Sequence, residues 1–207
     1  LLGVKSVMAP TTAGELLGKF TIGDLSDLRR VMEKVRQQVS PLQKSDRVTI
    51  DLDASLYEQC SKRKQGSRMN YKGQIGYYPI FAFWAEEQEM LKTHLLAGNK
   101  HAWPKALWLL KQAIAAAPEG LPLALRADSE FYIWDLIEFC EGFEPRPILF
   151  AITADQTQRL LKKVSALSEK SWKPYCDAQQ VAELWYGPDG HPPHRYVVKR
   201  AKVKDKK

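Results

Sequence analysis

Three aspartates that end two short apolar segments are the residues of this chain best suited to chemistry. Asp51 and Asp53 occupy alternate positions of the segment 47–55, and this period of two places both carboxylates on one face of a predicted strand. Asp128 follows a second apolar segment, 121–127. Carboxylates on an apolar strand are costly to bury alone, so the pair either faces solvent at a strand end or binds a basic side chain or a metal ion.

Metal-assisted chemistry on phosphodiesters is the reaction that such carboxylates support best. If the strand 47–55 is central and the strand before Asp128 lies beside it, Asp53 and Asp128 meet at the carboxyl ends of two neighbouring strands. Two such aspartates and a third acidic group can hold two magnesium ions about 3.5–4 Å apart, which activates water or a hydroxyl group for in-line attack on a phosphate. The spacing of the aspartates alone does not define a reaction.

Hydrophobic periodicity and turn residues predict the elements that must position these carboxylates. Helices are predicted at 8–20, 22–39, 101–117, 131–140 and 155–167, and strands at 47–55, 78–84, 90–96, 121–127, 148–152, 181–186 and 195–203. Thr11 or Thr12 is expected to cap the first helix, and 148–152 is expected to be a buried strand. An antiparallel meander followed by alternating strands and helices predicts an α/β fold with a mixed sheet.

The balance of charge indicates an anionic partner. The chain has a formal net charge of +7 and a sequence pI near 9.2, and nucleic acid is the usual partner of such a protein. The segment 58–77 mixes basic residues with tyrosines and glycines and is predicted to be a long loop or loose hairpin. Its cations are Lys62, Arg63, Lys64, Arg68 and Lys72. They either contact the backbone of DNA or form a solvated loop. Arg126 either holds a phosphate or forms a structural salt bridge.

Other kinds of site are not indicated. The three cysteines have no CxxC spacing and the four histidines no metal-ligand spacing, so no zinc site is predicted. No long apolar run or signal-peptide pattern occurs, so no membrane partner and a cytoplasmic location are expected. The basic run from Lys199 to Lys207 is expected to be a solvated tail. Trp172 and Trp185 are expected to pack in a core, with stacking on a DNA base as the alternative.

Several motifs together carry a resemblance to a known family. They are Met8-Ala-Pro-Thr-Thr-Ala-Gly-Glu15, Asp51-Leu-Asp53-Ala-Ser55, Gly76-Tyr-Tyr-Pro79, Gly98-Asn99, and Arg126-Ala-Asp128-Ser129 with Phe131 after it. In this order, over nearly the whole chain, they resemble the DDE transposases of bacterial insertion sequences, in the group called transposase DDE domain group 1. The resemblance implies an RNase H-like catalytic domain and metal-dependent cleavage and strand transfer of transposon-end DNA.

The resemblance also implies roles for individual residues. Asp53 and Asp128 would be catalytic and bind metal, because the Asp-x-Ser/Thr pattern of the family falls on Asp53 and Ser55. Asp51 would be a further carboxylate at the metal site. Magnesium, which manganese can replace, is the implied cofactor. Double-stranded DNA at transposon ends and target sites is the implied partner, and a homodimer in a synaptic complex and a bacterial, nucleoid-associated location are expected.

The third catalytic carboxylate is the main departure from the family. The family carries it on a later helix, in a pattern of Tyr, Arg, Glu and Lys that no segment here matches. Glu130 stands where members usually have glycine, so it is expected near the metals without being assigned as a ligand. The expected domains are an N-terminal helical segment (1–45), the first part of the RNase H-like core (46–168) and a partial β-rich insertion with a basic tail (169–207). The chain is expected to be a fragment with little or no activity.

Two other functions remain open. A truncated, non-catalytic remnant of a transposase would bind DNA through its basic loop alone. A structure-selective nuclease on the same fold would need a complete carboxylate triad. A third acid within reach of the metal therefore separates the enzymes from the binding protein.

Overall fold

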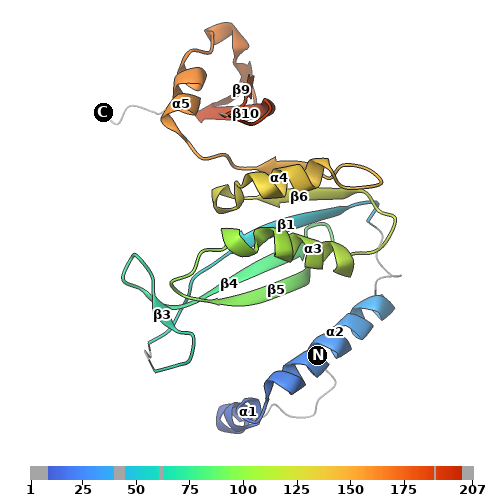
Figure 1. Cartoon of the computed structure of the whole chain (residues 1–207). Helices are drawn as coiled ribbons and strands as arrows, with labels where there is room; N and C mark the ends of the chain where they lie inside the picture. The colour runs from blue at the N-terminus through green and yellow to red at the C-terminus, as the bar shows by residue number, and fades with distance from the viewer. Residues whose placement is uncertain (1–8, 40–44, 61–62, 189, 202–207) are drawn as a thin grey trace. The chain divides into compact units, whose positions relative to one another are not determined.

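The computed structural model describes residues 9–39, 45–60, 63–188 and 190–201. The chain forms two compact units, residues 1–153 and residues 154–207 (Figure 1). Residues 154–168, which the sequence-based division places with the core, group with the second unit. In the part of the chain that the structure describes, no helix is long and apolar enough to cross a membrane.

The first unit is built on a mixed sheet whose centre is β1. Its strands are β1 (Val48–Ala54), β2 (Tyr57–Glu58), β3 (Arg68–Met69), β4 (Ile75–Trp84), β5 (Glu89–Ala97), β6 (Leu123–Ala127) and β7 (Leu149–Ile152). β4 runs antiparallel between β1 and β5, and β6 runs parallel between β1 and β7. The order β5-β4-β1-β6-β7 confirms the predicted α/β fold class, with its antiparallel half, its parallel half and its central first strand.

One face of this sheet is buried under two helices, α3 (Ala106–Ala116) and α4 (Trp134–Glu141) (Figure 1). The even-numbered residues of β1 point to this face, and Val48 and Ile50 are fully buried. Leu109 and Leu110 of α3 are also fully buried, which stabilises the fold by roughly 1.5–3 kcal/mol for each side chain. The odd-numbered residues of β1, which include the aspartates, therefore point to the opposite face.

Three sequence-based predictions about these elements are wrong in detail. The helix predicted from residue 101 becomes α-helical only at Ala106, because Trp103–Lys105 forms a 3-10 turn around Pro104. α4 likewise begins at Trp134, after the 3-10 turn Ser129–Phe131. β7 is an edge strand rather than a buried one, and its Leu149 side chain is 76% exposed.

Two helices precede the sheet. α2 spans Ile22–Val39, as its periodicity predicts, but its apolar stripe is exposed, with Met32 at 66%. α1 spans Pro10–Leu17. Its N-cap is Ala9, without a side-chain hydrogen bond, so the predicted capping by a threonine is wrong. Proline at the first helical position starts the helix instead, because its fixed φ suits the first turn.

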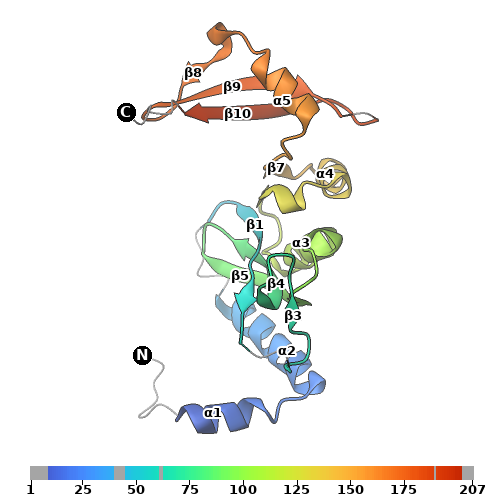
Figure 2. The same ribbon diagram turned by 90° about the vertical axis from the view of Figure 1, so that its left-hand side faces the viewer.

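The second unit is a small sheet with one helix (Figure 2). It contains α5 (Gln158–Ser165), β8 (Lys173–Pro174), β9 (Gln179–Tyr186) and β10 (His194–Ala201), and β9 pairs antiparallel with both other strands. The predicted final hairpin is confirmed as β9 and β10. Lys199 and Arg200 lie in β10 rather than in a solvated tail, and residues 202–207 lie outside the described part of the chain.

The acidic turn between β4 and β5 is tied to β1 through Glu86. The Glu86 carboxylate accepts hydrogen bonds from the Thr49 backbone N–H (2.9 Å), the Thr49 hydroxyl (2.5 Å) and Arg47 Nε (3.0 Å). Burial by itself raises the pKa of Glu86, but these hydrogen bonds outweigh it and lower the pKa to about 2. The charged form of Glu86 therefore stabilises the folded chain.

This carboxylate predicts a pH dependence of stability. Because folding depresses the pKa of Glu86, its contribution is present above about pH 4.5 and is lost as the pH falls toward 2. Glu86→Gln should lower the free energy of unfolding by about 1–2 kcal/mol near neutral pH and by much less near pH 2. Urea unfolding of both proteins across this range measures the difference. Glu119→Gln, an exposed glutamate in another turn, is the control; an equal loss at all pH values would contradict the assignment.

Candidate functional site

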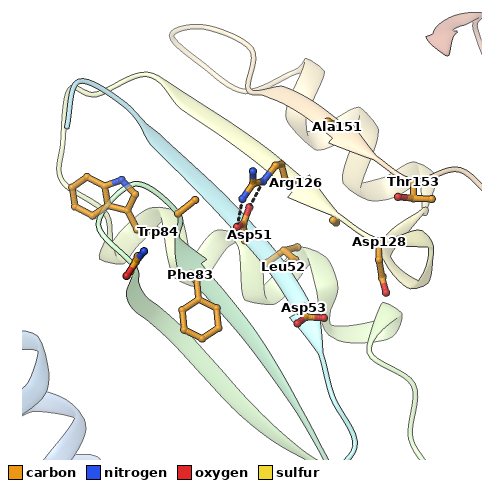
Figure 3. A pocket seen from close by; sticks show the side chains of 12 residues that line it. Asp51, Leu52, Asp53, Phe83, Trp84, Arg126, Asp128, Ala151 and Thr153 are labelled. Carbon is orange, nitrogen blue, oxygen red and sulfur yellow. Dashed lines mark hydrogen bonds and ion pairs between the residues drawn. The ribbon is translucent and has the colours of Figure 1, made fainter. Parts of the chain in front are cut away.

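The candidate site lies on the face of the sheet opposite α3, where β1 and β6 run side by side. Asp51 is in register with Arg126, and Leu52 with Ala127. Asp53 and Asp128 are the next residues along the two strands, so their side chains lie on adjacent strands and point to the same face (Figure 3). The prediction that these two aspartates meet at a common strand edge is thus consistent with the observed register.

These residues line an open cavity of about 760 Å³. Its lining residues are Asp51, Leu52, Asp53, Phe83, Trp84, Ala85, Gln88, Arg126, Ala127, Asp128, Ala151 and Thr153. The polar groups come from β1 and β6, and β4 and β7 add mainly apolar walls. The site therefore combines carboxylates and one cation on a largely apolar sheet surface (Figure 3).

Asp53 and Asp128 are exposed, and each carboxylate accepts one hydrogen bond from a backbone N–H. Asp53 Oδ1 accepts a hydrogen bond from the backbone N–H of Ala54 (2.8 Å), and Asp128 Oδ1 accepts one from the backbone N–H of Glu130 (3.0 Å). No residue that the structure describes donates to the Oδ2 atom of either carboxylate. Both side chains thus keep oxygen atoms that can bind a hard cation.

Asp51 differs from the other two aspartates because a cation already occupies both of its oxygens. Arg126 Nε donates to Oδ1 (2.6 Å) and Arg126 Nη2 donates to Oδ2 (2.5 Å), which is a bidentate pair across the β1–β6 register. The hydrogen bonds that Arg126 donates to Asp51 raise the pKa of the Arg126 guanidinium. A metal ion at Asp51 would have to share these oxygens with the guanidinium, whose positive charge disfavours a second cation there. Of the two roles expected for Arg126, the structure thus shows the salt bridge. Arg126 Nη1 makes no hydrogen bond to a described residue.

Glu130, which is expected near the metals from the sequence, is hydrogen-bonded to residues outside the cavity of the aspartates. Its Oε2 accepts a hydrogen bond from the Tyr78 hydroxyl (2.5 Å) and its Oε1 accepts one from the backbone N–H of Ala102 (2.7 Å). Burial and the hydrogen bond to Glu130 raise the pKa of Tyr78. Glu130 does not line the cavity of the aspartates. It instead ties β4 to the residues that precede α3.

Tyr78→Phe tests this structural role. The variant leaves one oxygen of a half-buried carboxylate without its partner, so the free energy of unfolding should fall by about 1–2 kcal/mol. Mn²⁺ binding should not change. Urea unfolding and a Mn²⁺ titration measure both properties, with Tyr77→Phe as the control because the Tyr77 hydroxyl bonds to an exposed backbone carbonyl. A Tyr78→Phe variant with altered Mn²⁺ affinity would place Glu130 at the metal site.

A complete carboxylate cluster is not found in the described ranges: no three His, Cys, Asp or Glu side chains there lie close enough to hold a metal ion together. Asp53 and Asp128 are left as a pair, because Asp51 is engaged by Arg126.

The predicted DNA-binding cations lie on the connection from β2 to β4. Arg63, Lys64, Arg68 and Lys72 are exposed there, and Lys62 lies outside the described residues. Arg68 in β3 pairs with Gly76 at the start of β4, whereas Asp53 pairs with Phe81 on the same strand. Five residues of β4 separate these points, or about 17 Å. The loop therefore lies beyond the carboxyl end of β1, and Arg68 is about 17 Å from Asp53 along β4.

Sequence analysis does not identify the apolar cavity wall or the tyrosine that holds Glu130. Phe83 lies beside Asp51 because the two residues are in register across β1 and β4. Tyr78 reaches Glu130 over 52 positions of sequence. The alternation of side chains along 78–84 predicts the face of the strand on which Phe83 lies. Its neighbour Asp51 depends on the register between β1 and β4, which the alternation does not give.

Comparisons with known proteins give two findings. The family model described as transposase DDE domain group 1 matches residues 6–207. A similar solved structure is the piggyBac transposase in the cryo-EM structure of its synaptic complex with hairpin DNA, with 13% sequence identity and a TM-score of 0.44. That match covers 78% of this chain, which spans about a third (35%) of the other chain. A search of curated protein sequences gives no match.

Proposed function

The chain belongs to the transposase DDE domain group 1 family, and from this premise we propose that it acts in DNA transposition, with Asp53 and Asp128 as its catalytic carboxylates. The observation that carries the proposal is the placement of these two aspartates on adjacent parallel strands, at one open cavity. The reaction is metal-dependent cleavage of transposon-end DNA followed by strand transfer.

The donor set of the cavity fits a hard divalent cation. Asp53 and Asp128 offer carboxylate oxygens on an open surface where water can complete the coordination, as magnesium prefers. We propose Mg²⁺ as the cofactor, with Mn²⁺ as its substitute. When bound, the ion polarises the phosphate and stabilises the leaving oxygen. Asp53 and Asp128 would hold it at the carboxyl ends of β1 and β6.

Arg126 has a role of its own in this proposal. Its Nε and Nη2 are fixed by Asp51, which leaves Nη1 to donate to a phosphate oxygen at the cavity. Asp51 then acts as a positioning residue for Arg126 instead of the metal ligand that the family resemblance implies. The bidentate geometry supports this assignment, because a metal ion at Asp51 would lie against the positive charge of the guanidinium that both oxygens already bind.

A third carboxylate is still required for two-metal catalysis. We propose that it lies outside the residues that form the described cavity, and that the 207-residue chain alone has little or no activity. Double-stranded DNA, at transposon ends and at the target, is the proposed substrate, and the basic loop supplies phosphate contacts. A homodimer in the synaptic complex and a cytoplasmic, nucleoid-associated location in a bacterium complete the proposal. The second candidate function is a non-catalytic DNA-binding remnant.

Mn²⁺-dependent nicking of supercoiled plasmid separates these functions. Any nicking by the chain should disappear in Asp53→Asn and in Asp128→Asn and should persist, though weakened, in Asp51→Asn, which keeps both proposed ligands. DNA binding with neither nicking nor Mn²⁺ binding at Asp53 and Asp128 would favour the remnant. Nicking that survives both Asp53→Asn and Asp128→Asn would contradict the catalytic assignment.

A further inference from the structure

The carboxyl end of β7 adds a third oxygen-bearing side chain to the cavity of the aspartates. β6 pairs with β7 through Ala127 and Ile152, and it pairs with β1 one residue before the aspartates. The next residues along these three parallel strands are Asp53, Asp128 and Thr153, and all three line the cavity (Figure 3). Because neighbouring strands lie about 4.8 Å apart, Thr153 is one strand away from Asp128 and two strands away from Asp53.

The backbone of Thr153 is fixed, whereas its hydroxyl group is available. The backbone N–H donates to the carbonyl oxygen of Ala127 (3.1 Å), which continues the β6–β7 ladder past Ile152. No residue in the described part of the chain hydrogen-bonds to the Thr153 hydroxyl. Alternation along β7 places Thr153 on the cavity face together with Ala151, and both residues are exposed. The cavity thus contains a positioned hydroxyl group that can donate to a ligand.

A second donor lies diagonally across from this hydroxyl. Arg126 is in register with Ala151, so Arg126 and Thr153 are one strand and two residues apart, with Cα atoms separated by about 8 Å. Since Nε and Nη2 of Arg126 face Asp51, Nη1 points away from that carboxylate. Ala151 lies next to both donors on an edge strand and carries only a methyl group. A group with several acceptor oxygens can therefore reach both donors.

The polar groups of the cavity favour its β7 side for a phosphate. The carboxylates repel a phosphate that approaches them directly. On the β4 side, Phe83 has no donor, and the indole N–H of Trp84 already donates to the Arg47 carbonyl (3.1 Å). Gln88 follows β4 in the turn at the opposite end of β1 from Asp53. The residues that β7 contributes to the described cavity include no acid.

We propose that Thr153 and Arg126 together bind the phosphate next to the one that is cleaved, and that the DNA backbone passes over Ala151. The Thr153 hydroxyl donates to one phosphate oxygen and Arg126 Nη1 donates to another. Asp53 and Asp128, on the same face, stay available to the metal ion. The inference rests on the proposed function, in which this cavity cleaves DNA, and it adds a substrate-binding residue and the side from which the strand enters.

Binding of a labelled duplex with and without Mn²⁺ tests this contact. Phosphate contacts carry no sequence information, so a duplex of arbitrary sequence serves as the probe. Thr153→Val keeps the shape of the side chain but removes its hydroxyl, so affinity in Mn²⁺ should fall about tenfold, whereas Thr153→Ser should stay within about twofold of wild type. Ala151→Leu should weaken binding at least as much as Thr153→Val, because the larger side chain covers the path of the backbone.

Three controls accompany these variants. Electron paramagnetic resonance titration should give wild-type Mn²⁺ affinity for Thr153→Val and Ala151→Leu, because neither changes a proposed metal ligand. Thr12→Val removes an exposed hydroxyl from α1 and should leave DNA binding unchanged. If one phosphate is shared, Thr153→Val should weaken binding much less in an Arg126→Gln background than in the wild type, because the two effects are coupled.

Wild-type DNA affinity of Thr153→Val in Mn²⁺ would overturn the proposal, and so would a Thr153→Ser variant as weak as Thr153→Val. Reduced Mn²⁺ affinity of Thr153→Val would also overturn it, since the hydroxyl would then belong to the metal site. Fully additive losses with Arg126→Gln would contradict a shared phosphate. If Asp53→Asn still abolishes Mn²⁺ binding, these outcomes refute this inference alone. Wild-type Mn²⁺ affinity in both Asp53→Asn and Asp128→Asn would contradict the proposed function as well.

Discussion

Replacing Arg63, Lys64, Arg68 and Lys72 with alanine is expected to weaken binding of duplex DNA by about 10²–10³-fold near 0.1 M salt. The four exposed side chains lie on one connection, which is beyond the carboxyl end of β1. Each phosphate contact releases a counterion, so the slope of log affinity against log salt should fall by about 3.6. Titration of a labelled duplex at several salt concentrations measures both quantities.

The matched control for this variant removes four exposed cations from elsewhere in the first unit, namely Lys100, Lys105, Lys111 and Arg146. It changes the net charge by the same amount, so it should lower the affinity only slightly. A control variant that loses as much affinity and slope as the loop variant would show that the loop is an ordinary solvated surface. That outcome would also remove the main support for duplex DNA as the partner.

Gly98→Ala should be strongly destabilising. A Cβ atom at Gly98 would lie 2.4 Å from the backbone oxygen of Arg68 and 2.4 Å from that of Gly76, far inside van der Waals contact. Both neighbours are backbone atoms of paired strands, so β3 and β4 would have to move together. The expected loss is about 3 kcal/mol of unfolding free energy, measured by urea unfolding. Because Arg68 belongs to the basic loop, duplex binding should weaken as well.

Gly14→Ala is the control, since a Cβ atom there meets nothing within 4 Å and the residue lies inside α1. It should leave stability unchanged or raise it by a few tenths of a kcal/mol, because alanine is the better helix former. An unfolding midpoint of Gly98→Ala equal to that of the wild type would contradict the close backbone packing. The resemblance motifs Gly76-Tyr-Tyr-Pro79 and Gly98-Asn99 would then need another explanation.

Much of the first unit could be predicted because its signals are local. The alternation along β1 places Asp51 and Asp53 on one face, and the apolar segment before Asp128 predicts β6. The pairing of β1 along both of its edges follows from its place between β4 and β6, which the order of strands and helices also predicts.

The partners of the site residues could not be predicted, because they depend on register and on turn geometry. A shift of one residue between β1 and β6 would separate Arg126 from Asp51, and no local pattern fixes that register. Glu130 stands two residues after Asp128, but the 3-10 turn at Ser129–Phe131 directs its side chain to Tyr78 and Ala102. Proximity in sequence is therefore a poor guide to the metal site.

The second unit shows a further limit of sequence reasoning. Tryptophan is usually buried, so composition favours a core position for Trp185. Its exposure follows from the alternation of β9, in which Ala182 is buried and Glu183 and Trp185 lie on the other face. The basic residues of α5 and Trp185 of β9 are more than twenty positions apart in the sequence, so no local pattern predicts that they lie close together.

Mn²⁺ binding, measured by electron paramagnetic resonance titration, is the most direct test of the central claim that Asp53 and Asp128 form the metal site. The account predicts that Asp53→Asn and Asp128→Asn each weaken Mn²⁺ binding at least about tenfold. Asp51→Asn should retain it within a few-fold, because Arg126 engages both Asp51 oxygens. Wild-type affinity in Asp53→Asn and Asp128→Asn, or a loss confined to Asp51→Asn, would contradict the account.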